Sequence, residues 1–436
     1  MVSPLLERST SRARDLSRRA LLGGAGGVCV SALIGLDPAR AFAQDFASGR
    51  ATGGSAPASA PFGAALAPGG SAAILTVQED LNRRYGGRRD WVTLPLDGIA
   101  DRRLATGLIF AVQFEIGLAD GVANGNFGPA TRAGLKAKGL LSVGDQDTDE
   151  AFVHLFQAGF IALGYSMPYD GVFSDDVSTA VAAFQSFVAL DPSGAGDFST
   201  WASLLVSTGD TERAGAAIDA ASTVRAARAQ ALFEAGYRVV GRYLTNTPVA
   251  DPLDKRIKPG ELDTIFDAGL GVFPIFQEDG TSAGQFSADS GVVHANRAAE
   301  AALGYGFRAG TTIYFAVDFD VSEAQIHNRI VPYFRSIRDV FATRSHGYVI
   351  GVYGARRLCI VLESEGLALN SFVGDLSTGY EGNIATPLPG NWAFDQILET
   401  SVGSGAGAMD IDKNVMSGRD PGQTAVDVRG GFDTVP

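Results

Sequence analysis

The feature that most constrains the fold is a regular alternation of strand-like and helix-like segments in the second half of the chain. Helical patterns such as TVRAARAQALFEAG and GELDTIFDAG end at Gly236 and Gly269, just before the next apolar run. Glycine at these positions is a typical helix stop. The strand candidates are AAID (216–219), RVVGRYL (238–244), LGVFPIF (270–276), TIYFAVD (312–318), VIGVYG (349–354), SFVGDL (371–376), WAFDQI (392–397) and MDIDKNV (409–415).

Eight such strands with helical crossovers in about 200 residues favour an α/β fold, a (β/α)8 TIM-like barrel over residues 213–425. An open parallel sheet is the alternative. In a barrel the loops that follow the strands converge over one mouth, so residues at the carboxyl ends of the strands become the candidates for function.

The segment TTIYFAVDFDVSE, residues 311–323, ends one of these strands with Asp318 and Asp320. Side chains alternate along a strand, so both carboxylates are expected on one face, about 7 Å apart. A pair of carboxylates can do acid and base work on a glycosidic bond. The alternative is a strand that ends in solvent, where Asp320 or Ser322 caps the next helix.

The other strand ends add an acidic, aromatic and amide-bearing set. Such a set suits a sugar, because amides and carboxylates bind hydroxyls while aromatic faces cover the apolar side of the ring. Asp219 on the first strand and Asp410 or Asp412 on the last contribute further carboxylates, and crowding them raises the pKa of at least one. The predicted substrate contacts are Tyr243, Gln277, Glu278, Tyr353, Asp375, Trp392 and Gln396.

The sequence lacks the residue patterns that a zinc, serine or cysteine hydrolase would need. The four histidines form no HExxH pattern and none stands at a strand end, so we expect no metal site and no cofactor. No G-x-S-x-G elbow follows a strand. Cys359 lies in the helical pattern RRLCIVLESEG, where core packing is expected, and Cys29 lies in the N-terminal segment, so the mature chain forms no internal disulfide.

From AIDAAS through MDIDKNV the chain resembles the glycoside-hydrolase-like barrel of exported actinobacterial proteins, which is itself similar to the family 25 lysozymes. The resemblance is carried by IYFAVDFD, AIDAAS, GVYG, WAFDQI and the D-x-N of Asp412 and Asn414, in this order. It implies muramidase chemistry, with Asp320 as the acid and Asp318 as the base or charge stabiliser. Asp219 and Asp412 would be the remaining carboxylates of the site.

One departure from the lysozymes bears on activity. They have Asp-x-Glu where this chain has Asp318-Phe319-Asp320, so the expected proton donor is one methylene shorter and reaches about 1.5 Å less. Glu278 is the alternative longer acid, although it stands one position out of register with Gln277.

The N-terminal residues 1–43 read as an export signal. Arg18 and Arg19 precede a Gly- and Ala-rich apolar stretch that ends in the cleavage pattern Ala41-Phe42-Ala43, and the segment resembles a twin-arginine signal. Residues 44–73, rich in Gly, Ala, Ser and Pro, are expected to form a flexible linker. We therefore expect a secreted or cell-envelope protein with no membrane span in the mature chain.

Residues 74–142 and 150–206 form a weak internal repeat of about 72 residues. Each copy reads as helix, Asp-Gly turn, helix, glycine-containing loop and helix, which predicts two small three-helix all-α modules before the barrel. The order of signals resembles the peptidoglycan-binding domain family. Gln113 and Gln185 stand at its FQ position, and Thr131 and Thr200 start its last helix.

The net charge of −13 argues against nucleic acid as a partner, because a phosphate-binding face needs clustered positive charge. Together these features predict a monomeric, secreted cell-wall hydrolase that cleaves peptidoglycan glycan strands or a related wall polysaccharide. The alternative function is a non-catalytic glycan-binding protein with a degenerate barrel.

Overall fold

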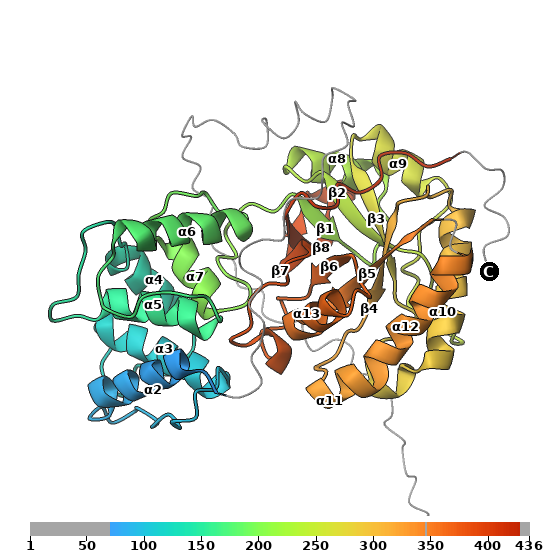
Figure 1. Cartoon of the computed structure of the whole chain (residues 1–436). Helices are drawn as coiled ribbons and strands as arrows, with labels where there is room; N and C mark the ends of the chain where they lie inside the picture. Colours follow the sequence, from blue (N-terminus) through green and yellow to red (C-terminus); the bar gives the residue numbers. More distant parts are fainter. Residues whose placement is uncertain (1–69, 345–346, 428–436) are drawn as a thin grey trace, which may run out of the picture. The chain divides into compact units, whose positions relative to one another are not determined.

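A computed structural model of the chain describes residues 70–344 and 347–427. The predicted export signal and nearly all of the predicted linker lie outside this range. The described residues fold into six helices followed by a closed barrel (Figure 1).

The barrel is closed by eight strands in sequence order, which confirms the expected closed eight-strand α/β barrel. Strands β1 to β7 pair in parallel. Their interiors are rich in Val, Ile and Phe, as expected for strands that are buried on both faces. The strands are β1 (Ala217–Asp219), β2 (Val239–Tyr243), β3 (Gly271–Phe276), β4 (Thr312–Ala316), β5 (Val349–Gly354), β6 (Asn370–Val373), β7 (Trp392–Val402) and β8 (Met409–Met416).

The last strand departs from the expected (β/α)8 arrangement. Strand β8 runs antiparallel to both β7 and β1. Only residues 403–408 join β7 to β8, and they form a tight turn with Gly403 and Gly405 at positive φ. A parallel crossover needs a dozen or more residues, so this link can only make a hairpin. As a result, Asp412 in the middle of β8 pairs with Asp219, the last residue of β1, and stands at the same end of the barrel as the carboxyl ends of the other strands.

Helices cover the outside of the barrel between the earlier strands, with α10 and α12 side by side (Figure 1). Within the described residues, only the short 3-10 turn η3 (Glu381–Asn383) stands between β6 and β7. The barrel helices are α8 (Ala226–Glu234), α9 (Glu261–Asp267), α10 (Ala288–Gly304), α11 (Glu323–Gln325), α12 (Val331–Arg344) and α13 (Arg356–Ser364).

The barrel interior is packed with aromatic rings below the mouth. Phe273 of β3 stacks on Phe394 of β7 with ring centroids 4.0 Å apart, and Tyr314 and Phe372 contact this pair edge-on. At the opposite end from the mouth, the Tyr314 hydroxyl donates to Asp420. The barrel is therefore a filled core below its mouth, as in other barrels of eight strands.

The first six helices are α2 (Ala72–Tyr85), α3 (Arg102–Glu115), α4 (Pro129–Lys138), α5 (Phe152–Ala162), α6 (Asp175–Phe187) and α7 (Phe198–Leu205). Buried glutamines fasten the turns between them. Gln113 donates to Thr131 Oγ1 over 2.9 Å, and Gln185 donates to Thr200 Oγ1 over the same distance. These glutamines thus hold loops together and have no free amide to offer a ligand.

The surface between the helical part and the barrel contains a buried ion-pair cluster. Arg356 of α13 donates to the Asp375 carboxylate over 2.6 Å and to the Ser207 carbonyl over 2.7 Å. Arg213 pairs with Asp395 of β7 over 2.8 Å. The cluster lies beside β6 and β7, between which the described residues form only the short turn η3.

Candidate functional site

Three carboxylates gather at the carboxyl end of the barrel strands. Asp219 ends β1, Asp412 faces it across the β1–β8 pairing, and Asp318 follows β4. Burial raises the pKa of the Tyr243 and Tyr353 hydroxyls well above the usual value, and the charges of all three carboxylates raise the pKa of each tyrosine further. The mouth therefore joins three acids and two phenols within electrostatic reach of one another.

Asp219 is the most deeply buried of the three acids. Its Oδ2 accepts hydrogen bonds from Gln396 Nε2 at 2.9 Å and from Asn414 Nδ2 at 3.0 Å. Burial raises the pKa of Asp219 to about 6; the two amides lower it and the Asp318 charge raises it. About half of Asp219 therefore carries a proton at pH 6, and about a tenth still does at pH 7.

Gln396 is oriented by a second contact. The Tyr353 hydroxyl donates to Gln396 Oε1 over 2.9 Å, which turns the amide nitrogen toward Asp219. The structure thus brings together Asp219, Tyr353 and Gln396, which the sequence placed at three separate strand ends. Asn414, the other donor to Asp219, was visible in the sequence only as part of the D-x-N motif.

Asp318 is held on the other side of the mouth. Gln277 Nε2 donates to Asp318 Oδ2 over 3.2 Å, and the Gln277 carbonyl oxygen accepts from Lys255 Nζ at 2.9 Å. The ammonium of Lys255 also lies 4.3 Å from the centroid of the Tyr243 ring. Sequence reasoning missed Lys255, because it comes from the long loop after β2 and follows no strand directly.

The structure separates Asp320 from Asp318. Strand β4 ends at Ala316, two residues before Asp318, so the predicted strand through Asp318 is too long and its alternation does not extend to Asp320. The side chain of Asp320 is exposed, and its Oδ1 accepts from the Glu381 backbone N–H at 2.9 Å. Asp320 thus holds the first backbone N–H of η3, and Ser322, one of the two residues named in the capping alternative, caps the helix that follows β4.

Three other predicted site residues also point away from the mouth. Glu278 is buried against α10, where it pairs with Arg297 at 2.7 Å, and burial raises its pKa. Asp375 is 0% exposed and pairs with Arg356. Trp392 starts β7, at the amino end of the strand, and its Nε1 donates to the Phe187 carbonyl. Each side chain has a protein partner that fixes it in place.

The sequence matches two known families. Residues 230–416 match the family described as "Rv2525c-like, glycoside hydrolase-like domain". The barrel is thus similar to glycoside hydrolase-like domains of the Rv2525c type. Residues 67–205, which contain the six helices, match the family described as "FadG/YbfG, PGDB-like domain".

Two curated relatives come from Bacillus subtilis. The uncharacterized protein FadG is 44% identical over 364 residues, which are 83% of this chain and 62% of FadG. The uncharacterized protein YbfG is 42% identical over 372 residues, which are 83% of this chain and 50% of YbfG. The chain thus spans between half and two thirds of the length of these relatives.

Two solved structures are similar to part of the chain. The Tat-secreted protein Rv2525c of Mycobacterium tuberculosis, in complex with HEPES, is 26% identical with a TM-score of 0.39, covering 48% of this chain and 99% of that one. An uncharacterized B. stearothermophilus protein is 18% identical with a TM-score of 0.33, covering 47% of this chain and 96% of that one.

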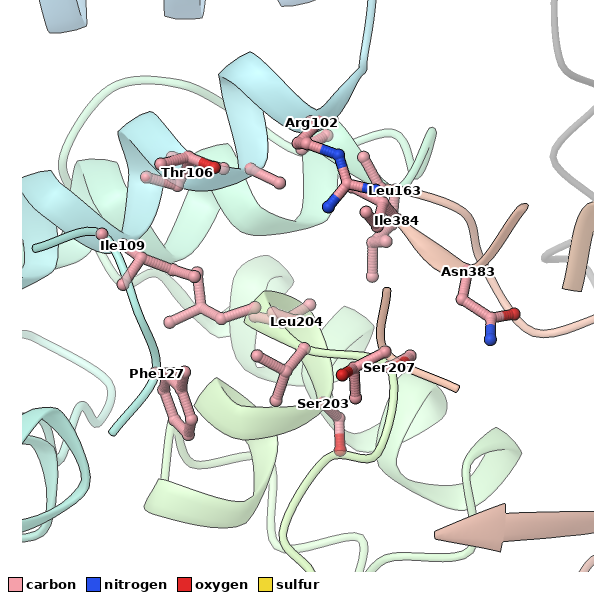
Figure 2. Close-up of a pocket in the computed structure, with 18 of the residues that line it drawn as sticks. Arg102, Thr106, Ile109, Phe127, Leu163, Ser203, Leu204, Ser207, Asn383 and Ile384 are labelled. Atoms are coloured by element: carbon pink, nitrogen blue, oxygen red, sulfur yellow. The ribbon is translucent and has the colours of Figure 1, made fainter. Parts of the chain in front are cut away.

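A separate cavity of about 220 Å³ lies between the six helices and the glycoside hydrolase-like domain. Figure 2 shows Ile109, Phe127 and Leu204 on one side of it and Asn383 and Ile384 on the other. Its charged lining residues are Arg102 and Arg356, and both donate to protein oxygens. Without a carboxylate among its lining residues it offers no acid or base for hydrolysis, so the mouth remains the candidate site.

Neither a metal site nor a membrane span is found in the part of the chain that the structure describes. Its His, Cys, Asp and Glu side chains form no group of three or more that could hold a metal ion. No helix within the same residues is long and apolar enough to cross a membrane.

Proposed function

We propose that the protein is a muramidase-like glycoside hydrolase that cleaves the glycan strands of bacterial cell-wall peptidoglycan. The observation that carries the proposal is the cluster of Asp219, Asp318 and Asp412 at the barrel mouth, in which one acid has its pKa raised to about 6. Glycoside hydrolysis needs one protonated and one ionised carboxyl group on either side of the bond. The match to a glycoside hydrolase-like domain supports the same class of reaction.

The environments of the acids assign their roles. Asp219, buried and partly protonated near neutral pH, is the proton donor to the leaving oxygen. Asp318, which accepts from Gln277, is the base or nucleophile, and Asp412 stabilises positive charge that develops on the sugar ring. Tyr243, Tyr353 and Gln277 form the walls that contact the sugar. This assignment replaces Asp320 with Asp219 as the acid.

The decisive experiment is incubation of the full mature chain with purified peptidoglycan. Mass spectrometry of the soluble products detects new reducing ends, and the sugar at each new end identifies the bond that is cut. A protein that releases no fragments at any pH between about 4 and 8, the range in which a paired carboxyl site changes its protonation, is not a glycan hydrolase of this wall polymer.

The pH dependence of cleavage follows from the pKa of Asp219. The folded pKa of about 6 lies above the usual value of 3.8, so the protonated donor is present below pH 6 and is lost as the pH rises through it. We expect the rate to fall by about tenfold for each pH unit well above that pKa. Initial rates of reducing-end formation across the acidic and mildly alkaline range test this, and a rate that still rises above neutral pH contradicts it.

A second candidate function is glycan binding without cleavage. The observation in its favour is the position of Asp320, which corresponds to the catalytic acid of the lysozymes that the sequence resembles. Here Asp320 is exposed and accepts from the Glu381 backbone N–H. In that case the protein sediments with insoluble peptidoglycan, while no reducing ends form. The helical part, which would add avidity for the polymer, serves either function.

We also propose that the chain reaches the cell envelope by twin-arginine export. Arg18 and Arg19, followed by the Ala41-Phe42-Ala43 cleavage pattern, support this. Replacing both arginines by lysine should leave unprocessed precursor inside the cell, because the export machinery reads the arginine pair itself. Immunoblots of cell and culture fractions measure it, and unchanged secretion of the double variant excludes this route.

A further inference from the structure

The cation inside the acidic mouth is the remaining unexplained feature of the site. Lys255 is 8% exposed, although lysine is among the residues least often buried. Its loop is folded back on β2 by Asn246, whose side-chain oxygen accepts from the backbone N–H groups of Lys255 and Arg256 at 3.0 and 2.9 Å. Arg256 then bridges to Tyr243, which fixes the loop beside the mouth.

The ammonium is held by neutral groups. It contacts the Gln277 oxygen at 2.9 Å and the face of the Tyr243 ring at 4.3 Å. Burial lowers the pKa of Lys255 to about 8, while the more distant charges of Asp318, Asp279 and Glu278 raise it. Lys255 therefore stays charged up to neutral pH. Its charge reaches Asp318 directly through space and also through the hydrogen bond to Gln277.

The geometry fixes the direction of the Gln277 amide. An ammonium only donates, so the amide must turn its oxygen to Lys255. Its nitrogen then points to Asp318 Oδ2 at 3.2 Å and must donate there. A carboxyl group that receives a donor is favoured in its ionised form. Lys255 and Gln277 thus form a short chain of donors that ends on one acid of the mouth.

We propose that Lys255 is a positioning residue that keeps Asp318 ionised through Gln277 and so decides which acid is the base and which is the proton donor. This inference rests on the proposed function for its catalytic meaning. The arrangement itself exists whether or not the protein cleaves glycan. Asp219 also receives amide donors, those of Gln396 and Asn414, and they lower its pKa, but its burial outweighs them and raises the pKa to about 6.

The test compares Lys255→Met with the matched control Lys258→Met on the same loop. The Lys258 ammonium pairs with Asp254 outside the mouth. Carboxyl-carbon NMR of the full chain, titrated through the acidic range and assigned with Asp318→Asn, follows the Asp318 pKa directly. We expect Lys255→Met to raise that pKa by about one unit and Lys258→Met to leave it unchanged. An unchanged Asp318 pKa in Lys255→Met overturns the proposal.

Steady-state kinetics separate this inference from the proposed function. If the wild type cleaves peptidoglycan, Lys255→Met should lower kcat roughly tenfold with little change in KM, and Lys255→Arg should restore most of it. A wild type without cleavage would remove the proposed function but leave the NMR result to decide the role of Lys255. If Lys255→Met does not fold, Lys255→Leu, which also has no donor for Gln277, is titrated in its place, with the same expected shift.

Discussion

Asp219→Asn is expected to slow glycan cleavage by about 10² to 10⁴-fold, the usual loss when a general acid is removed. Asparagine keeps the shape of the side chain, and its oxygen can still accept from Gln396 and Asn414. It has no proton to give to the leaving oxygen. Reducing-end formation about one pH unit below the Asp219 pKa, where the wild-type acid is mostly protonated, measures the loss.

Asp320→Asn is the matched control for this prediction. Asp320 is exposed, and an asparagine oxygen can accept from the Glu381 N–H as the carboxylate does. We therefore expect nearly normal cleavage from this variant. The opposite pair of results, a silent Asp219→Asn and an inactive Asp320→Asn, would return the role of proton donor to Asp320.

Asp219→Asn should also change stability, in a direction that depends on pH. The folded pKa of Asp219, about 6, lies above the usual value of 3.8, so the fold favours the neutral acid. The stability that this group contributes is fully present below pH 3.8 and is lost as the pH rises through 6. Asp219→Asn should therefore unfold at higher denaturant than wild type at mildly alkaline pH, and at about the same denaturant below the usual pKa of an aspartate.

The barrel strands could be predicted because each one has its own local pattern. Burial on both faces selects continuous apolar runs, and the glycines that end the helices mark where each strand begins. The direction of β8 is set by the short connection of residues 403–408, which allows only an antiparallel strand. The parallel arrangement was predicted because the lengths of the connections between strands were not considered. The end of β4 was missed for a related reason, since nothing in the sequence marks Ala316 as its last residue.

The site could be predicted only in part, because the partner of each side chain comes from elsewhere in the chain. Asp219 and Asp318 stand at or just after strand ends, and their place at the mouth follows from topology. Lys255 reaches the mouth through a loop whose course depends on Asn246. Asp375 also follows a strand, yet Arg356 on the preceding helix captures it. Strand-end position alone does not distinguish these cases.

Arg356→Met should destabilise the fold strongly. Methionine fills a similar length but leaves the Asp375 carboxylate, which is 0% exposed, without its counter-ion. It also removes the donors to the Ser207 and Thr386 carbonyls. Breaking a buried ion pair by removing one partner costs about 3 to 5 kcal/mol, so we expect a loss of that size in the free energy of unfolding.

The exposed ion pair between Arg102 and Glu381 provides the control, because it also links the helical part to the barrel. Its partners are 48% and 62% exposed, and Arg102→Met should cost at most about 1 kcal/mol. Urea unfolding followed by fluorescence compares the two variants, since Trp392 is buried at the same boundary. If Arg356→Met unfolds like the wild type, the buried pair does not hold the helices to the barrel. A large loss of stability in Arg356→Met alone identifies the buried pair as a structural link between the helices and the barrel.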